Sequence, residues 1–324
     1  MGQRPPRVAS LNLMPRQIIA TAYTGLDSIA ERDVPPAVAE PGKVVVAMRA
    51  AGVNRSDIKS ALGMFGNDES KLPLRLGNEI SGVVTSVGDD VDHVAPGDEV
   101  VAYRVSGGFA AEVVAPASAV FHKPESLGWG EAAGLMLTGT TAWHLVEATG
   151  VRAGDIVIVN GASGGVGTLV AQLAVARGAT VVGTASAKNF EAVRESGAEP
   201  VEHGPGLIER LRAALPDGAT VALDTVGNDD FLDAAIELVP DRQRIATIEA
   251  FERGAELGIL RLGGGPGADP GSAIRNASRQ PLLDLAGSGK LKVSVGRTFP
   301  LAEIRDAFEL VGGRHPGGKV IVVP

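Results

Sequence analysis

The chain of 324 residues is long enough for two domains of ordinary size. It carries 30 basic and 38 acidic side chains, a formal charge of −8, and this balance excludes the basic face that nucleic-acid binding requires. The chain has no cysteine, which excludes disulfides, thiolate metal sites and a cysteine nucleophile. No apolar run reaches the roughly 20 residues that cross a bilayer. We therefore expect a cytoplasmic protein without membrane or nucleic-acid partners.

The N-terminal part is expected to form a β-rich, barrel-like domain. Residues 1–15 are rich in arginine and proline and predict a flexible extension ahead of a first strand at 17–23. Short β-branched runs separated by turn residues favour a barrel over alternating strands and helices. These runs predict strands at 44–50, 82–87, 99–103 and 110–115.

The pattern changes after Trp129, where few helix breakers occur and a helix is predicted over 131–148. Strands then alternate with helices, which indicates a parallel sheet with helices on both faces. The predicted strands are 156–160, 180–184, 219–223 and 244–248, and the helices between them include 165–177 and 188–195. The last segment, 291–324, returns to strand, helix and strand. We expect one domain at 16–126 and 290–324, with a second domain, 127–289, inserted into it.

A glycine-rich turn follows the strand at 156–160. Its glycines stand at 161, 164 and 167, a G-x-x-G-x-x-G spacing in place of the usual G-x-G-x-x-G. Glycine lets the backbone turn tightly and approach a pyrophosphate, while the helix N-terminus offers free N–H groups and a positive dipole end. The turn therefore predicts a dinucleotide site, with candidate contacts at Ser163, Gly164, Gly165 and Val166.

The end of the next strand distinguishes between the two nicotinamide dinucleotides. An NAD site commonly places a carboxylate there to bind the ribose 2′-hydroxyl. Residues 181–188 read V-V-G-T-A-S-A-K, and no carboxylate occurs before Glu191. Thr184, Ser186 and Lys188 are therefore candidate contacts of NADPH, with Lys188 facing the 2′-phosphate. The alternative for Lys188 is a solvated lysine at the start of a helix.

Four stretches of the chain carry a family resemblance. They are A-A-G-V-N-R-S-D at 50–57, G-N-E at 77–79 with G-D-E-V at 97–100, N-G-A-S-G-G-V-G at 160–167, and H-P-G-G-K-V at 315–320. Together they resemble the medium-chain dehydrogenase/reductase superfamily, in its zinc-free quinone oxidoreductase branch, from about residue 16 onward. The resemblance implies an α/β fold with a GroES-like β-barrel catalytic domain and a Rossmann-type doubly wound parallel sheet domain. Substrate and nicotinamide would meet in the cleft between them.

The resemblance also bears on metal and substrate. Asn78 stands where zinc-dependent relatives have a histidine, and the five histidines of the chain show no ligand spacing, so we expect no metal site. Without zinc, an alkoxide has no Lewis acid to stabilise it. Conjugated acceptors such as quinones, enones and enoyl thioesters delocalise the developing charge themselves. The resemblance therefore implies NADPH-dependent reduction of such an acceptor.

The strip 54–65, N-R-S-D-I-K-S-A-L-G-M-F, is similar to a strip in the enoyl reductase domains of polyketide synthases, which share its A-L-G-M run. Asn54 and Asp57 are implied to line the nicotinamide side of the cleft, although Asp57 could instead cap a turn. Lys59 and Phe65 stand where many relatives have tyrosines, which puts a tyrosine proton donor in doubt. These four residues are the catalytic candidates, and Lys188 is a further possible donor.

Other cofactor contacts implied by the family are Thr141, Thr225 and Lys319, together with Asn54. His203 falls where relatives often have a tyrosine near the adenosine phosphate. Residues 254–271 have no family counterpart, and within them 263–271 is expected to form a glycine-rich loop. Residues 255–260 are expected to supply the edge of a homodimer.

Three functions remain open at this stage. The first is an NADPH-dependent reductase of quinones or of α,β-unsaturated carbonyl compounds. The second is a non-catalytic NADPH-binding protein, which the replacement of two tyrosines by Lys59 and Phe65 would suit. The third is an enoyl reductase, tailoring reductase or dehydratase of a biosynthetic pathway.

Overall fold

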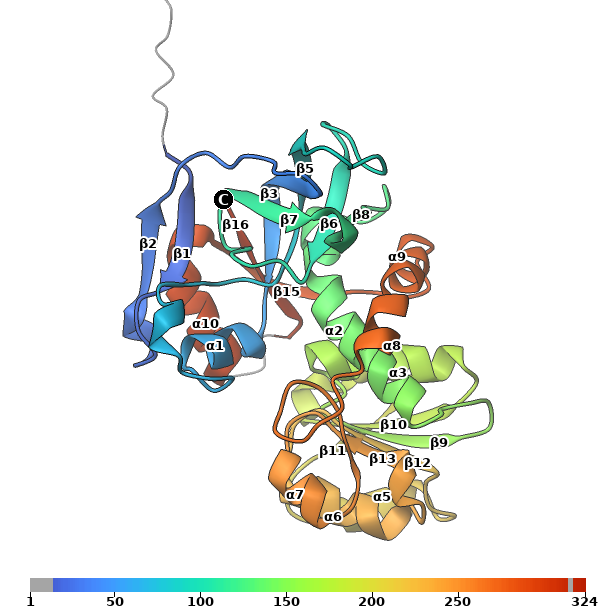
Figure 1. Cartoon of the computed structure of the whole chain (residues 1–324). Coiled ribbons are helices and arrows are strands. Elements are labelled where there is room, and N and C mark those ends of the chain that lie inside the picture. Colours follow the sequence, from blue (N-terminus) through green and yellow to red (C-terminus); the bar gives the residue numbers. More distant parts are fainter. Residues whose placement is uncertain (1–13, 314–316) are drawn as a thin grey trace, which may run out of the picture.

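The computed structural model describes residues 14–313 and 317–324. Most of the predicted N-terminal extension, and His315 and Pro316 of the C-terminal motif, lie outside these residues. The described chain builds two large sheets, of seven and six strands, with helix α2 (Trp129–Ala148) between them (Figure 1). The predicted α/β class, a barrel-like part with a doubly wound parallel part, is confirmed.

The seven-stranded sheet has the order β15-β16-β3-β5-β6-β8, and β7 also pairs with β3. Its strands are β3 (Lys43–Val53), β5 (Glu79–Val87), β6 (Glu99–Tyr103), β7 (Glu112–Pro116), β8 (Val120–His122), β15 (Val295–Pro300) and β16 (Lys319–Val323). β16 pairs antiparallel with β3, so that Val320 lies opposite Val53. The C-terminal strand therefore joins the sheet of the N-terminal half.

Smaller elements close this part of the fold. A three-stranded sheet has the order β2-β1-β4, and helices α1 and α10 lie on the same side of the molecule (Figure 1). These elements are β1 (Arg16–Ala20), β2 (Ile29–Asp33), β4 (Leu74–Arg75), α1 (Arg55–Ala61) and α10 (Ile304–Gly313). β1 ends before the predicted residue 23, because a turn closes there with Thr21 N–H donating to Ser28 O at 2.9 Å.

The six-stranded sheet is parallel, in the order β11-β10-β9-β12-β13-β14. Its strands are β9 (Ile156–Asn160), β10 (Thr180–Ala185), β11 (Glu199–Glu202), β12 (Val221–Asp224), β13 (Ile245–Thr247) and β14 (Leu260–Arg261). The helices of this part are α3 (Gly165–Ala176), α4 (Phe190–Glu195), α5 (Leu207–Ala214), α6 (Asp229–Leu238), α7 (Phe251–Glu256), α8 (Ser272–Ala277) and α9 (Arg279–Gly287).

Helices cover both faces of this sheet. Side chains of a strand alternate between its faces, and in β9 Val157 and Val159 pack in one core cluster with Leu169 of α3. Ile158 packs in another with Phe231 of α6. This alternation explains why β9 reads as an unbroken apolar run, as expected of a strand that is buried on both faces.

β14 lies at the edge of the six-stranded sheet. Of the segment predicted to form a dimer edge, residues 255–256 end α7 and residue 260 begins β14. The homodimer itself stays a prediction. Within the described ranges, no helix combines the length and apolarity that crossing a bilayer requires.

A buried carboxylate organises the carboxyl end of the parallel sheet. Asp224, fully buried at the end of β12, accepts hydrogen bonds from Asn160 Nδ2 at 2.7 Å and Thr247 Oγ1 at 2.6 Å. Thr184 Oγ1 in turn donates to Asn160 Oδ1 at 2.7 Å. These bonds join the ends of four neighbouring strands, β10, β9, β12 and β13, and so fix the edge from which the glycine turn departs.

Candidate functional site

A cleft of about 600 Å³ opens between the two sheets. One wall comes from α1, the end of β6 and the start of β16, and the other from the glycine turn and the ends of β12 and β13. Most of the residues that the sequence singled out meet here. They are Asn54, Lys59, Phe65, Thr141, Ser163, Gly164, Gly165, Val166, Thr225 and Lys319.

The glycine turn forms one wall of the cleft. Gly161 has φ +71, a conformation that favours glycine, and a Cβ there would lie 2.5 Å from Val226 Cγ2. A Cβ on Gly167 would lie 2.2 Å from Gly161 O, so this position needs glycine for close packing of the turn on α3. Gly164 caps α3 with φ −81 and has only Gly161 O near its Cβ position, at 3.2 Å. Its missing side chain therefore leaves space in the cleft itself.

This turn has the properties of an anion cradle. The first N–H groups of a helix have no partner within the helix and carry its positive dipole end. In α3 these groups belong to Gly165 and Val166, both of which line the cleft. Thr225 holds the turn from the neighbouring strand end, donating from Oγ1 to Asn160 O at 2.7 Å. The arrangement suits the pyrophosphate of a dinucleotide.

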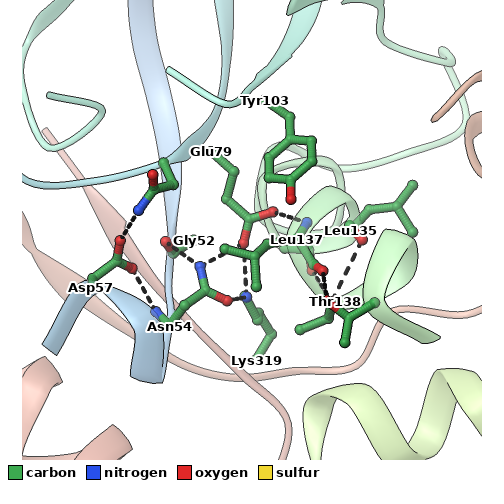
Figure 2. Close-up of polar contacts among 12 residues, drawn as sticks. Gly52, Asn54, Asp57, Glu79, Tyr103, Leu135, Leu137, Thr138 and Lys319 are labelled. Atoms are coloured by element: carbon green, nitrogen blue, oxygen red, sulfur yellow. Dashed lines mark hydrogen bonds and ion pairs between the residues drawn. The ribbon is translucent and has the colours of Figure 1, made fainter. Parts of the chain in front are cut away.

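A buried ion pair forms the opposite side of the cleft. Lys319 Nζ lies 2.8 Å from Glu79 Oε1, and the side chains are 5% and 0% exposed (Figure 2). Lys319 Nζ also donates to Asn54 Oδ1, while Asn54 Nδ2 donates to Glu79 Oε1 at 2.9 Å. The second oxygen of Glu79 accepts from Leu137 N at 2.8 Å. Asn54 Nδ2 also donates to Gly52 O at 3.2 Å, so the orientation of the amide is set by partners on β16, β5 and β3.

Close packing buries this cluster, in which Asn54, Glu79 and Lys319 are at most 5% exposed. A Cβ on Gly52 would lie 2.5 Å from Glu79 Oε1 and 2.5 Å from Ala133 O, so only glycine lets β3 approach α2 here. An ammonium group has three N–H donors, and Asn54 and Glu79 take two of those of Lys319. Lys319 and Asn54 both line the cleft, and the third N–H of Lys319 is left for a ligand, whereas the N–H groups of Asn54 already donate to Asp57, Gly52 and Glu79.

Asp57 lies behind this cluster and outside the cleft lining. Its carboxyl oxygens accept from Asn54 N at 2.9 Å and Asn78 Nδ2 at 2.6 Å (Figure 2). Burial raises the pKa of Asp57 to about 7, although the hydrogen bonds from Asn78 and Asn54 act in the opposite direction. Asp57 thus fixes the backbone at the start of α1, as the capping alternative stated, and acts on the cleft through Asn54.

Lys59 and Phe65 bridge the cleft toward the parallel sheet. Lys59 Nζ in α1 lies 2.7 Å from Glu249 Oε2, just after β13, with both side chains about one-quarter exposed, at 25% and 23%. The Phe65 ring is 3.8 Å from the Cβ position of Gly264 in the glycine-rich loop. The predicted catalytic pair therefore contacts the opposite wall, and the Lys59 ammonium already has a carboxylate partner.

Four other predicted cofactor contacts lie outside the cleft lining: Thr184, Ser186, Lys188 and His203. Thr184 is buried and supports the turn, its Oγ1 accepting from Gly161 N at 3.1 Å. Ser186 and Lys188 are beside the turn, because Asn189 Nδ2 donates to Ser186 Oγ at 3.1 Å and to Ser163 Oγ at 3.3 Å. Lys188 and His203 are exposed.

The cleft also holds residues that the sequence did not single out for a role: Tyr103, Arg104, Glu249 and Arg275. They come from the end of β6, the turn after β13, and α8, so no local pattern joins them. A positive φ of 66° at Arg104 is invisible in the sequence. The G-N-E stretch did point to Glu79, but only as a family match.

The donor set of the cleft is relevant to metal binding. Among residues 14–313 and 317–324, no group of three or more histidine, cysteine, aspartate or glutamate side chains is placed to hold a metal ion. The carboxylates nearest Asn54 are engaged by Lys319, Asn54, Asn78 and Leu137 N. An ammonium group within this cluster would also repel a divalent cation.

Comparison with known proteins agrees with this geometry. Residues 40–125 match the family "Alcohol dehydrogenase GroES-like domain", and residues 191–322 match the family "Zinc-binding dehydrogenase". The chain is 29% identical to a quinone oxidoreductase of Pseudomonas aeruginosa, covering 96% of this chain and 100% of that protein. It is 33% identical to the spectinabilin polyketide synthase system protein NorB of Streptomyces orinoci, covering 88% of this chain but only 13% of that protein.

Solved structures show the same architecture. A structure described as an NAD-dependent alcohol dehydrogenase aligns with a TM-score of 0.84 at 28% identity, covering 95% of this chain and 99% of the other. A mycobacterial protein in complex with NADPH aligns with a TM-score of 0.83 at 26% identity, covering 96% and 100%.

The raised pKa of Asp57 predicts a pH-dependent stability. Because its folded pKa lies above the unfolded value of about 3.9, the contribution of Asp57 is complete below that value and is lost as pH rises to about 7. Between about pH 5 and pH 8 the wild type should therefore lose about 2–3 kcal/mol of unfolding free energy relative to Asp57→Asn. Urea denaturation of both proteins across this range measures the difference. A pH-independent difference would contradict a buried carboxyl that titrates near neutrality.

The two glycines around the start of α3 predict opposite outcomes. Gly164→Val should fold normally, because its φ is ordinary and its side chain would enter the cleft, but it should abolish dinucleotide binding. Gly167→Ala should instead lower the melting temperature, because its Cβ meets backbone. Calorimetric titration with NADPH and NADH, together with thermal melts, tests both variants. Unchanged affinity in a folded Gly164→Val protein would place the cradle elsewhere.

Proposed function

Because the chain belongs to the medium-chain dehydrogenase/reductase superfamily, we propose that this oxidoreductase uses NADPH to reduce a conjugated acceptor without a catalytic zinc. The acceptor is a quinone or an α,β-unsaturated carbonyl compound. One observation carries the proposal: the glycine turn of the parallel sheet and the Asn54–Lys319 pair of the other sheet face a single cleft of about 600 Å³. A dinucleotide and an acceptor can meet in this cleft.

The chain's own residues fit a nicotinamide dinucleotide. NADPH supplies a hydride when bound. The space left by Gly164 and the N–H groups of Gly165 and Val166 would take the pyrophosphate. Thr141, Thr225, Asn54 and Lys319 line the part of the cleft between the two sheets and would orient the nicotinamide end. The mycobacterial structure in complex with NADPH supports this assignment.

The preference for NADPH rests on the loop after β10. Ser186 is half-buried and Lys188 is exposed beside the turn, and no carboxylate occurs between residues 185 and 191. The N–H of His203 donates to Ala185 O at 3.2 Å, which brings the end of β11 to the same edge. A hydroxyl donor and a cation at this edge suit a 2′-phosphate, whereas an NAD site needs an acidic group there.

The donor set supports reduction without zinc. The carboxylates behind the cleft lining, Glu79 and Asp57, are held by an ammonium and by amide donors, so they do not offer a ligand set for a divalent cation. A conjugated acceptor suits such a site because it spreads the developing negative charge over its own atoms. Lys319 lines the cleft, and the N–H that Asn54 and Glu79 leave free would orient the oxygen of the acceptor.

The relatives suggest two acceptor classes and do not distinguish between them. One is a quinone oxidoreductase and another is a polyketide synthase component, of which this chain resembles only a part. The test is therefore an activity assay with benzoquinone, phenanthrenequinone, an alkyl vinyl ketone and crotonyl-CoA, in which turnover is measured as the loss of NADPH absorbance. Turnover of one class selects the acceptor. Tight NADPH binding with no turnover on any acceptor would overturn the reductase and favour a binding protein.

Lys188→Ala tests the cofactor preference. Loss of one charge-assisted contact should raise the KM for NADPH by roughly tenfold or more, with NADH kinetics unchanged. Lys290→Ala, which removes an exposed lysine after α9, serves as the control and should alter neither cofactor. An equal loss with NADPH and NADH would contradict the assignment of Lys188 to the 2′-phosphate.

A further inference from the structure

Three guanidinium groups gather around the Tyr103 ring at one end of the cleft. Arg275 is only 7% exposed and lines the cleft, while Arg279 is 9% exposed with its guanidinium 5.4 Å from the centre of the ring. Arg104 follows Tyr103 in the chain, lines the cleft and is exposed. Within the described chain, none of the three lies within 4.0 Å of a carboxylate oxygen.

Arg275 is held in place by neutral groups. Its Nη1 donates to Thr141 Oγ1 at 2.8 Å, and its Nε donates to His144 Nδ1 at 3.3 Å. Its Nη2 lies 3.8 Å from the Cβ position of Gly263, in the loop that forms the cleft wall. The Tyr103 side chain is a further hydrogen-bond partner of the guanidinium. All three partners are neutral, so among residues 14–313 and 317–324 the guanidinium is fixed in the cleft lining without a carboxylate to balance its charge.

His144 does not neutralise this charge. Burial lowers the pKa of His144, and the neighbouring Arg275 acts in the same direction, so the ring is neutral and accepts at Nδ1. Asp269 Oδ2 lies 3.6 Å from His144 Nε2 on the far side of the ring and is 62% exposed. The carboxylate nearest to Arg275 is thus separated from it by a neutral imidazole and screened by water.

An unpaired buried cation is unfavourable without an anionic partner. Burial lowers the pKa of Arg275, and the positive charge of Arg104 adds to this, while Tyr103 opposes it. A guanidinium nevertheless stays charged in proteins. Arg104 is also held at φ 66°, in the left-handed region that is unfavourable for a non-glycine residue. The cleft thus holds one buried cation, Arg275, and one cation on a strained backbone, Arg104, and together they suit an anionic ligand.

We infer that Arg275 and Arg104 form a subsite for a carboxylate, so that the acceptor is an acidic conjugated carbonyl compound. This inference rests on the proposed reductase activity and names its substrate class. Tyr103 and Arg104 come from the same sheet as Asn54. Within α2, Thr138 faces Gly165 of the phosphate cradle. Arg275 instead bonds to Thr141, about one helical turn further along α2 and so further from the cradle. The subsite is therefore on the acceptor side of the cleft, distinct from the phosphate cradle. A guanidinium edge binds a carboxylate through parallel N–H···O bonds.

The test compares β-acetylacrylate with its methyl ester, two enones that differ in one negative charge. With NADPH, the wild type should show a kcat/KM at least tenfold higher for the acid. Arg275→Met should lower the value for the acid by tenfold or more and leave the ester within twofold. Arg275→Lys keeps the charge but not the planar fork, so its kcat/KM for the acid should lie between those of the wild type and Arg275→Met. Arg279→Met is the matched control: it removes a buried guanidinium beside the same ring that does not line the cleft, and should keep the preference for the acid.

The outcomes separate the two claims. Turnover of the ester tests the reductase, and the ratio of acid to ester tests the subsite. A wild type that reduces both equally well, or an Arg275→Met protein that loses both equally, would overturn the subsite. A weakened NADPH affinity in Arg275→Met with an unchanged ratio would assign the guanidinium to the cofactor instead.

A binding measurement tests the subsite without turnover. Levulinate and methyl levulinate are saturated analogues of the two substrates, and each can be titrated calorimetrically into the NADPH-loaded wild type. Levulinate should bind at least tenfold more tightly than its ester, and raised salt should reduce the difference. Equal affinities for acid and ester would overturn the subsite even if neither enone were reduced or the Arg275 variants failed to fold.

Discussion

The buried contact between Lys319 and Glu79 is the interaction on which the cleft depends. It joins the first residue of the last strand to the first residue of β5, and through Leu137 N–H it extends to α2. Two charges removed from water tolerate little displacement, because either one left alone in the interior costs several kcal/mol. Asn54 completes the set by bonding both groups. The Lys319–Glu79 contact therefore helps to hold the C-terminal strand in place and also orients the Asn54 amide.

The opposite wall depends on a second buried carboxylate, and the two walls are linked through α2. Asp224 joins the strand ends behind the glycine turn, accepting also from Val226 N and Gly227 N at 3.0 and 2.9 Å. α2 packs on β3 and β5 at one side and on α3 at the other. Because Glu79 bonds to Leu137 N in the middle of α2, the Asn54–Lys319 cluster of the first sheet is fixed relative to the glycine turn of the parallel sheet. Lys59 and Glu249 add a more exposed contact across the opening.

Charge is distributed unevenly over this protein. The whole chain carries a formal charge of −8, yet among the described residues the cleft lining has one acid, Glu249, against five basic side chains: Arg55, Lys59, Arg104, Arg275 and Lys319. Lys319 and Lys59 are paired with carboxylates, so the free positive charge lies with the arginines. A cationic cleft in an acidic protein attracts anions over a distance set by salt screening. Such a field favours both an anionic cofactor and an acidic acceptor.

The sequence by itself determined the class of fold, the glycine turn and the absence of thiol chemistry, because these depend on local periodicity, backbone freedom and residue type. The strand–turn–helix at 156–176 and its glycines are correct in the structure for that reason. Partnerships between distant residues were decided only by the tertiary structure. Lys59 and Glu249 are 190 positions apart, and Tyr103, Thr141 and Arg275 come from three separate elements. Whether a charged side chain is paired, buried or turned into a cleft depends on the atoms that folding places around it, and no local pattern encodes those neighbours.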